Sequence, residues 1–173
     1  SNHSVSNFAS DFTTSFKPSE INGLELWLDA NDTNSITHSS NSISLWADKS
    51  GNGNDATQGT ASNQPLLTSS GLQFDGTDDG FNLSKDISQP NLNIFLVAEG
   101  YGYIFANNGT DRALFLNSNQ NLYWTFNSSS TFDNVAIGAY SASSSQLLEF
   151  SLNSGTAKLR LNGAEVSSQG SVS

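Results

Sequence analysis

The chain has 173 residues and a formal net charge of −10 at pH 7, from 6 Lys and Arg against 16 Asp and Glu. This length fits one sizeable domain, which needs neither disulfides nor a metal merely to stay folded. Cys is absent, which excludes thiol catalysis, disulfides and thiolate metal sites, while the acidity disfavours nucleic acid and anionic membranes.

The first twenty residues differ from the rest because they are rich in Ser, Thr and Asn. Their apolar residues recur at spacings of three and four, namely Val5, Phe8, Phe12 and Phe16. This spacing would place them on one face of a helix, although Ser and Thr are poor helix formers. We expect an arm over 1–20 that lies across its own domain or inserts into a neighbouring one. Because the chain starts at Ser1 without a Met, we expect this start to be a processed end, an excised fragment or an engineered boundary.

From Gly23 onward, short apolar runs alternate with polar turns. Leu24, Leu26 and Leu28 recur with period two, which predicts a half-buried strand. Further strands are predicted over 43–47, 72–74, 81–83, 93–98, 102–106, 113–117, 122–126, 135–140, 147–152, 158–161 and 164–166. The dipeptide Asn162-Gly163 predicts a two-residue hairpin between the last two. This series of short strands without a long helix predicts an all-β sandwich or jelly roll.

Three segments in order carry a resemblance to a known family. They are 23–30 (GLELWLDA), 45–57 (LWADKSGNGNDAT) and 72–79 (LQFDGTDD). Together with the hairpin over 158–166 (KLRLNGAEV), they resemble laminin-G-like domains of the concanavalin A-like lectin/glucanase superfamily, as found in bacterial surface and phage-associated proteins. The resemblance implies a two-sheet antiparallel jelly-roll sandwich over 21–173, preceded by the arm or linker over 1–20.

The C-terminal part departs from the family pattern. Members usually close the sandwich with a further strand that carries an F-x-G-x-I-x-E pattern, and none follows Ser167. A sandwich without that strand has a bare backbone edge. We expect the natural polypeptide to continue, or another segment, such as the Phe-bearing arm of this chain or of a neighbour, to fill the gap.

Two oxygen-rich clusters are candidate calcium sites. In the first, Gly51 and Gly53 permit a tight loop with positive φ angles. Its oxygen-bearing residues are Asp48, Asn52, Asn54 and Asp55. The second cluster is Asp75, Asp78 and Asp79. Oxygen ligands suit Ca²⁺, and the resemblance adds that such sandwiches often hold calcium at these loops. The alternative is ordinary turn chemistry, in which Asp and Asn bond to their own backbone.

Aromatic residues are the candidates for stacking on sugar rings, because their faces are apolar and tolerate polar rims. They are Trp27, Trp46, Trp124, Tyr101, Tyr103, Tyr123 and Tyr140. Most aromatic residues of a two-layer sandwich belong to its core, and the turn at 101–103 and the loop at 107–111 are the features expected to be exposed. The predicted ligand-binding residues are Tyr101, Tyr103, Asn107, Asp111 and Trp124.

Catalysis is not expected. Glucanases of this fold use paired carboxylates on one strand, whereas Glu149 has no second acid beside it. Asp78 and Asp79 are adjacent and would face opposite sides of a strand, and no triad partner lies near His3 or His38 in the sequence. No apolar run approaches membrane-spanning length.

The expected function is therefore non-catalytic recognition of a glycan or another surface ligand. The chain would be part of a larger extracellular adhesin, fibre or enzyme, at a cell or virion surface. The alternative is a structural component of a virion or cell-surface assembly, which packs through the sandwich and the arm against copies of itself or other domains. Fold does not decide between these functions.

Overall fold

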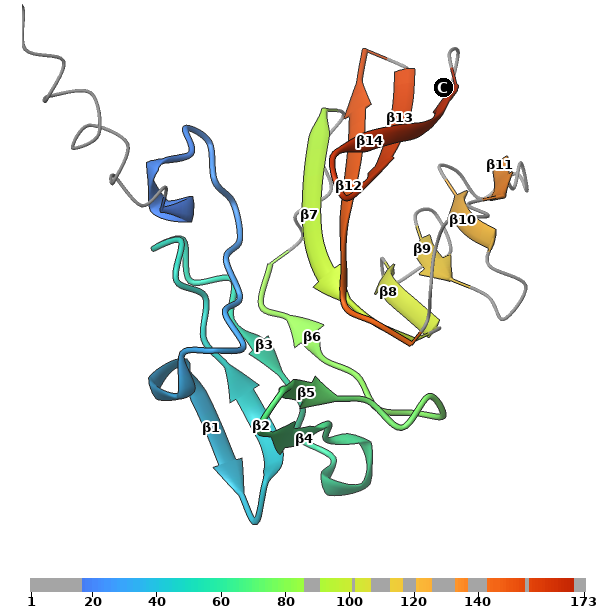
Figure 1. The fold of residues 1–173 in the computed structure, drawn as a ribbon. Helices are drawn as coiled ribbons and strands as arrows, with labels where there is room; N and C mark the ends of the chain where they lie inside the picture. The colour runs from blue at the N-terminus through green and yellow to red at the C-terminus, as the bar shows by residue number, and fades with distance from the viewer. Residues whose placement is uncertain are drawn as a thin grey trace, which may run out of the picture. The chain divides into compact units, whose positions relative to one another are not determined.

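The computed structural model describes residues 17–85, 91–100, 102–106, 113–116, 121–125, 133–136, 143–154 and 156–169, with backbone only for the strands between 102 and 136. The chain forms two compact units, Ser1–Ile87 and Ser88–Ser173 (Figure 1). Within the described residues, strands and turns are joined by short 3₁₀ helices and there is no α-helix. The all-β prediction is confirmed. No helix in these parts of the chain is long and apolar enough to cross a membrane.

The first unit contains one antiparallel sheet in the order β5-β4-β2-β3-β6, with β1 paired to β2. Its strands are β1 (Ile36–Ser39), β2 (Ser42–Trp46), β3 (Ala56–Thr57), β4 (Leu66–Thr68), β5 (Gly71–Gln73) and β6 (Asn82–Leu83). The 3₁₀ helices of this unit are Pro18–Glu20, Thr33–Ser35 and Ala61–Asn63. Ile36, Ile43, Ala56 and Pro65 are buried at its centre, and Ile43 has an exposed fraction of 0%.

The second unit contains two four-stranded antiparallel sheets, which is compatible with a sandwich (Figure 1). One sheet has the order β14-β13-β12-β7 and the other β11-β10-β9-β8. The strands of the first are β7 (Leu92–Ala98), β12 (Gln146–Asn153), β13 (Thr156–Leu161) and β14 (Ala164–Gln169). Those of the second are β8 (Gly102–Ala106), β9 (Ala113–Leu116), β10 (Asn121–Thr125) and β11 (Asp133–Ala136).

One face of the sheet formed by β7, β12, β13 and β14 is buried. Alternate residues of β12, namely Leu148, Phe150 and Leu152, have almost no exposed surface. Leu159 and Leu161 of β13 are also buried, and they lie opposite Phe150 and Leu148 in the register. Directly opposed residues of antiparallel strands share a face. These side chains therefore form one continuous apolar layer.

The opposite face of this sheet carries charges and two exposed apolar residues. Glu149 lies between Phe95 and Arg160 in the register, and its carboxylate is 3.8 Å from the Arg160 guanidinium. Arg160 also lies 3.8 Å from Glu165. Phe95 and Val97 of β7 are 62% and 68% exposed.

Two hairpins have the turn chemistry that such connections require. Asn162 and Gly163 have φ angles of 50° and 83° between β13 and β14, which confirms the predicted hairpin. Ser40 and Asn41, with φ angles of 49° and 70°, connect β1 to β2 in the same way. The second hairpin was not predicted, because Ser-Asn is a weaker turn signal than Asn-Gly.

Most predicted strands are present within a residue or two of their expected bounds. The strand predicted at residues 24–28 is wrong, since no residue between 24 and 29 belongs to a strand. β1, β3 and β4 were not predicted. The jelly-roll order, the single domain over 21–173 and the missing closing strand stay predictions. The arm's apolar residues and the chain after residue 169 lie outside the described residues.

Candidate functional site

The loop at residues 48–55 is organised around the carboxylate of Asp48. Its Oδ1 accepts the backbone N–H groups of Trp27 at 2.9 Å and Ser50 at 2.8 Å. Its Oδ2 accepts the Ser50 hydroxyl at 2.7 Å and the Asn54 N–H at 3.0 Å. Four donors therefore bind the two oxygens of one side chain, one from Trp27 in the preceding segment and three from within the loop.

The same loop also holds the preceding segment through its amide side chains. Asn52 Nδ2 donates to the Leu24 carbonyl at 2.7 Å, and Asn54 Nδ2 donates to the Glu25 carbonyl at 2.6 Å. The Asp48 N–H in turn donates to Asp55 Oδ1 at 2.9 Å. Residues 24–27 therefore bond mainly to side chains of this loop, with one backbone bond from the Lys49 N–H to the Trp27 carbonyl at 2.8 Å. Among the described residues they have no neighbouring strand to pair with, which explains why the predicted strand is absent.

The hydrogen bonds at Asp48 favour its charged form. Burial would raise the pKa of Asp48, but the N–H of Trp27, the hydroxyl and N–H of Ser50 and the N–H of Asn54 outweigh it and lower the pKa. Gly51 and Gly53 have φ angles of 92° and 69°, as predicted for a tight loop. These contacts are the turn chemistry that the sequence left as the alternative to calcium binding.

One polar atom of this loop has no partner. Asn54 is 2% exposed, and its Oδ1 accepts no hydrogen bond among the described residues. An orphaned oxygen is a possible cation ligand, but the Asp48 oxygens beside it in the loop already accept four donors. Calcium binding by Asp48, Asn52, Asn54 and Asp55 stays a prediction.

Trp27 has a cation over its ring. Lys49 Nζ lies 4.4 Å from the ring centroid and forms ion pairs with Asp29 at 2.8 Å and Asp32 at 2.7 Å. The hydrogen bond from Lys49 is the main cause that lowers the pKa of each carboxyl, and the two carboxyls raise the pKa of Lys49. One face of Trp27 is thus covered by a cation–π contact, and the ring anchors this segment.

The acid triad, defined as Asp75, Asp78 and Asp79, lies in the loop after β5. Its carboxylates each offer an oxygen within 4.8 Å of the others, the one such group of potential metal ligands among the described residues. Asp75 Oδ1 accepts the N–H of Thr77 at 2.8 Å, and the Asp75 N–H donates to Asp79 Oδ2 at 2.8 Å. The N–H of Thr77 is the main cause that lowers the pKa of Asp75. The predicted second cluster is therefore brought together.

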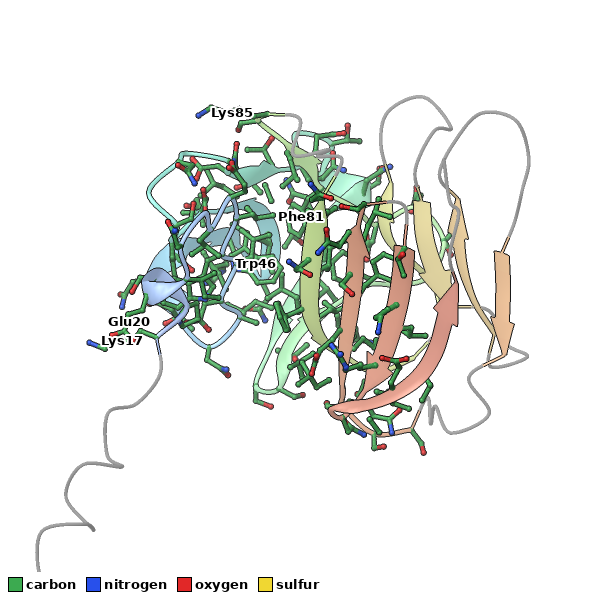
Figure 2. The ribbon with its side chains drawn as sticks, turned by 90° about the horizontal axis from the view of Figure 1, so that it is seen from above. Lys17, Glu20, Trp46, Phe81 and Lys85 are labelled. Atoms are coloured by element: carbon green, nitrogen blue, oxygen red, sulfur yellow. The ribbon has the colours of Figure 1, made fainter. Side chains whose placement is uncertain are left out.

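Aromatic rings flank the acid triad. Phe74 is 48% exposed, and its ring packs nearly perpendicular to Phe81 with centroids 6.0 Å apart. Phe81 lies 6.2 Å from Trp46 of β2, and Figure 2 labels both. Trp46 is therefore part of the packing of the first unit, as expected for most aromatic residues.

The backbone pairing of β8 to β11 brings the positions of three aromatic residues opposite one another. Tyr103 lies opposite Phe115, and Phe115 lies opposite Tyr123. Directly opposed positions in antiparallel strands share a face, so these three positions form one line across β8, β9 and β10. We name this line the aromatic row. Asn134 of β11 continues it, because it lies opposite Tyr123.

A β-bulge makes this alignment possible. The register of β8 shifts between Tyr103 and Phe105, which leaves Ile104 as the additional residue. Without the shift, Tyr103 and Phe105 would share a face, since side chains alternate with period two. With it, Phe105 joins Leu114 and Trp124 on the other face. Bulges often redirect a side chain in this way.

The two faces of this sheet differ in composition. The positions that alternate with the aromatic row are mostly apolar, with Gly102 and Asp133 as the exceptions: Phe105, Leu114, Leu116, Leu122, Trp124 and Val135. The row shares its face with small and uncharged residues: Ala106, Ala113, Asn121, Thr125, Asn134 and Ala136. An antiparallel sheet commonly has one apolar core face and one solvated face. The aromatic row therefore lies on the less apolar of the two faces.

The predicted ligand-binding residues have different outcomes. The register assigns Tyr103 to the aromatic row and Trp124 to the apolar face, so their positions are not on one surface. Tyr101, Asn107 and Asp111 lie outside the described residues. Sequence reasoning missed Phe115, because it stands between Leu114 and Leu116 in an apolar run that is typical of a buried strand. Phe74 was missed as well, because a half-exposed Phe has no sequence signal of its own.

Comparisons of this chain with protein-family models, with curated proteins and with solved structures found no match.

Proposed function

We propose that this protein is a non-catalytic recognition module that binds a glycan through the aromatic row. The observation that carries the proposal is the register of β8, β9 and β10, which aligns Tyr103, Phe115 and Tyr123. Flat aromatic faces suit the apolar faces of pyranose rings, and the Tyr hydroxyl adds a polar group at the rim. A rigid sheet is also a better platform for such positions than a loop.

The proposed fold and cellular location follow from the resemblance to laminin-G-like domains. The fold would be a concanavalin A-like jelly-roll sandwich of the laminin-G type, lectin-like and extracellular, within a larger adhesin, fibre or enzyme. The acidic surface and the absence of Cys support such a setting. The pair of four-stranded sheets in the second unit supports the sandwich architecture.

The proposal includes calcium binding by the acid triad. Among the described residues, no hydrogen bond engages Asp75 Oδ2, Asp79 Oδ1 or either carboxylate oxygen of Asp78. Carboxylate oxygens are the ligands that Ca²⁺ prefers, so this donor set fits the ion. The N–H groups that bind Asp75 hold the cluster in place. A bound calcium would neutralise part of the local charge.

Affinity electrophoresis through gels that contain soluble polysaccharides tests the proposal. We expect the wild-type protein to be retarded and Phe115→Ala and Tyr123→Ala to lose at least about tenfold in affinity, as each removes one stacking contact. Phe74→Ala removes a half-exposed aromatic ring of the first unit and serves as the control that retains binding. Unfolding curves verify that each variant is folded. Equal binding by the wild type and Tyr123→Ala would refute the role of the row.

A structural role in an assembly is the second candidate function, and β7 is the observation that favours it. Within the described part of the chain, β7 pairs only with β12, and it carries the exposed residues Phe95 and Val97. A flat apolar edge strand readily accepts another strand. A multimeric mass in solution that Phe95→Lys converts to a monomer, together with no glycan binding, would favour this function.

A further inference from the structure

We infer that the Asn52-Gly53 pair is a self-modification site, at which the chain converts its own asparagine to aspartate and isoaspartate. The pair lies in the loop at residues 48–55, and both residues are exposed. The reaction needs only this chain and solvent water, so it goes beyond the proposed function and does not depend on it. Its consequence is a weaker attachment of the segment that precedes the loop.

The backbone nitrogen of Gly53 is the nucleophile of this reaction. It loses its proton to a solvent base and attacks Cγ of the Asn52 side chain, and the new C–N bond closes a succinimide ring. The bond between Cγ and Nδ2 breaks, and Nδ2 takes up a proton and leaves as ammonia. Water then adds to either carbonyl of the ring, which leaves aspartate or isoaspartate at residue 52. This loss of the amide is one reason why Asn is a thermolabile residue.

The surroundings of Gly53 favour its attack on the neighbouring side chain. Gly53 has no side chain that could crowd the approach, and a Cβ built there would meet nothing within 4 Å. Among the described residues, no hydrogen bond engages the Gly53 N–H, although the N–H groups of Asn52 and Asn54 on either side both donate one. Solvent base can therefore reach this proton without first breaking a hydrogen bond.

Lys85 acts on the same peptide bond. Its Nζ donates to the carbonyl oxygen of Asn52, and Figure 2 labels this lysine. When the Gly53 nitrogen loses its proton, negative charge spreads onto that oxygen through amide resonance. A cation in contact with the oxygen stabilises the charge, so Lys85 makes the nitrogen more acidic. Because Lys85 is exposed, solvent screening limits the effect to a few-fold in rate.

Two other Asn-Gly pairs of the described residues lack this arrangement. Asn22-Gly23 is exposed, and no described side chain donates to the Asn22 carbonyl. Asn162 lies in the β13–β14 turn, where its Oδ1 accepts the Leu147 N–H at 3.0 Å and its N–H donates to the Leu147 carbonyl at 2.8 Å. Both of these bonds restrain Asn162. The two pairs therefore serve as internal references for the rate at Asn52.

The modification removes a hydrogen-bond donor from the first unit. Asn52 Nδ2 donates to the carbonyl of Leu24 at 2.7 Å and to that of Glu25 at 3.3 Å. An ionised carboxylate only accepts hydrogen bonds, so the product brings its oxygens against two carbonyl oxygens and repels them. Asn54 Nδ2 still donates to the Glu25 carbonyl at 2.6 Å. We therefore expect residues 24–25 to loosen while the loop itself stays folded.

Peptide mapping by mass spectrometry during incubation at neutral pH tests the reaction. We expect Asn52 to convert at least as fast as Asn22 and faster than Asn162, with both acid products present. In Lys85→Met, the ratio of the rate at Asn52 to the rate at Asn22 should fall about threefold, since the cation beside the reacting amide is removed. Lys158→Met, which removes a cation of the second unit, should keep the ratio.

Each outcome of this mapping bears on one part of the mechanism. An Asn52 that stays intact while Asn22 converts overturns the modification site. A ratio that is the same in the wild type and in Lys85→Met overturns the role of Lys85.

Limited digestion with a glutamate-specific protease tests the consequence. Asn52→Asp reproduces one product and should raise the rate of cleavage after Glu25 at least about threefold, because cleavage follows the population of the opened segment. Asn41→Asp makes the same change of charge at an exposed residue of this unit and should leave the rate unchanged. Equal rates in the two variants overturn the local release. Cleavage of Asn52→Asp that rises equally after Glu149 of β12 indicates global unfolding and overturns it as well.

Discussion

The carboxylate of Asp48 accepts the backbone N–H of Trp27 at 2.9 Å, across 21 residues of sequence. The same carboxylate accepts N–H groups from Ser50 and Asn54. One side chain thus joins a segment without strand partners to the loop that follows β2. The stability of the first unit should depend on it more than on any exposed acid nearby.

Replacement of Asp48 should therefore destabilise the protein. Asp48→Ala removes an acceptor of four hydrogen bonds, and hydrogen bonds to a charged group contribute about 2 kcal/mol each before solvent exposure and relaxation reduce them. We expect a loss of about 3 kcal/mol in the free energy of unfolding, measured in urea. Asp78→Ala, an exposed acid of the same unit, is the control and should leave stability unchanged. Equal losses in both variants would contradict the structural role of Asp48.

Stability should fall in acid for the same reason. The pKa values of Asp29, Asp32 and Asp48 are below the ordinary value of 3.8, so their protonation favours the unfolded chain. Their contribution is complete above about pH 5 and disappears as the pH falls through 3.8 toward the lower folded-state values. Urea unfolding at a series of pH values between 7 and 2 measures this loss.

The variant Lys49→Met distinguishes the contribution of Asp29 and Asp32 from that of Asp48. It removes the main cause of the lowered pKa of Asp29 and Asp32 but leaves the donors to Asp48. We expect a shallower dependence of stability on pH in this variant. A wild-type protein whose stability stays constant from pH 5 to pH 2 would contradict these shifts.

Calcium should stabilise the first unit through the acid triad. For a site with millimolar affinity, typical of extracellular modules, 10 mM calcium should raise Tm by about 3 °C. Asp78→Asn keeps the side-chain shape, removes the charge and should abolish the shift. Glu20→Gln, which removes an exposed acid elsewhere in the unit, should keep it. A shift that persists in Asp78→Asn would place the ion elsewhere, with Asp48, Asn52, Asn54 and Asp55 as the next candidates.

The turn between β13 and β14 provides a test of backbone conformation alone. Gly163 has φ +83°, and an added Cβ would meet nothing within 4 Å. Gly163→Ala should therefore cost about 1 kcal/mol through the left-handed conformation, without a clash. Gly59 has the same free space and no positive φ, so Gly59→Ala should be neutral or slightly stabilising. Equal unfolding free energies for the two variants would argue against this turn geometry.

Local chemistry explains which parts of the fold the sequence predicts. Asn162-Gly163 suffices for a hairpin because the turn itself requires positive φ at both positions. The alternation of Leu24, Leu26 and Leu28 predicts a strand equally well, and that prediction fails. A strand needs a neighbouring strand to pair with. Here, backbone groups of residues 24–27 bond to side chains of the 48–55 loop instead.

The candidate site likewise has one part that the sequence predicts and one part that it does not. The acid triad is predictable because its members lie within five residues and their side chains bond to the local backbone. The aromatic row depends on the pairing of three strands and on the bulge at Ile104. A shift of one residue would exchange the two faces. Period-two alternation in one strand does not carry that information.

The contacts of residues 24–27 also affect the order in which the chain folds during synthesis. Their partners lie from 21 to 29 residues later in the chain, so a ribosome that adds about 5–20 residues per second needs a few seconds to make them. The hairpin of β1 and β2 requires only residues between them and can form during this delay. We therefore expect the N-terminal segment to be added to a hairpin that already exists, so that it becomes resistant to protease on the nascent chain later than this hairpin does.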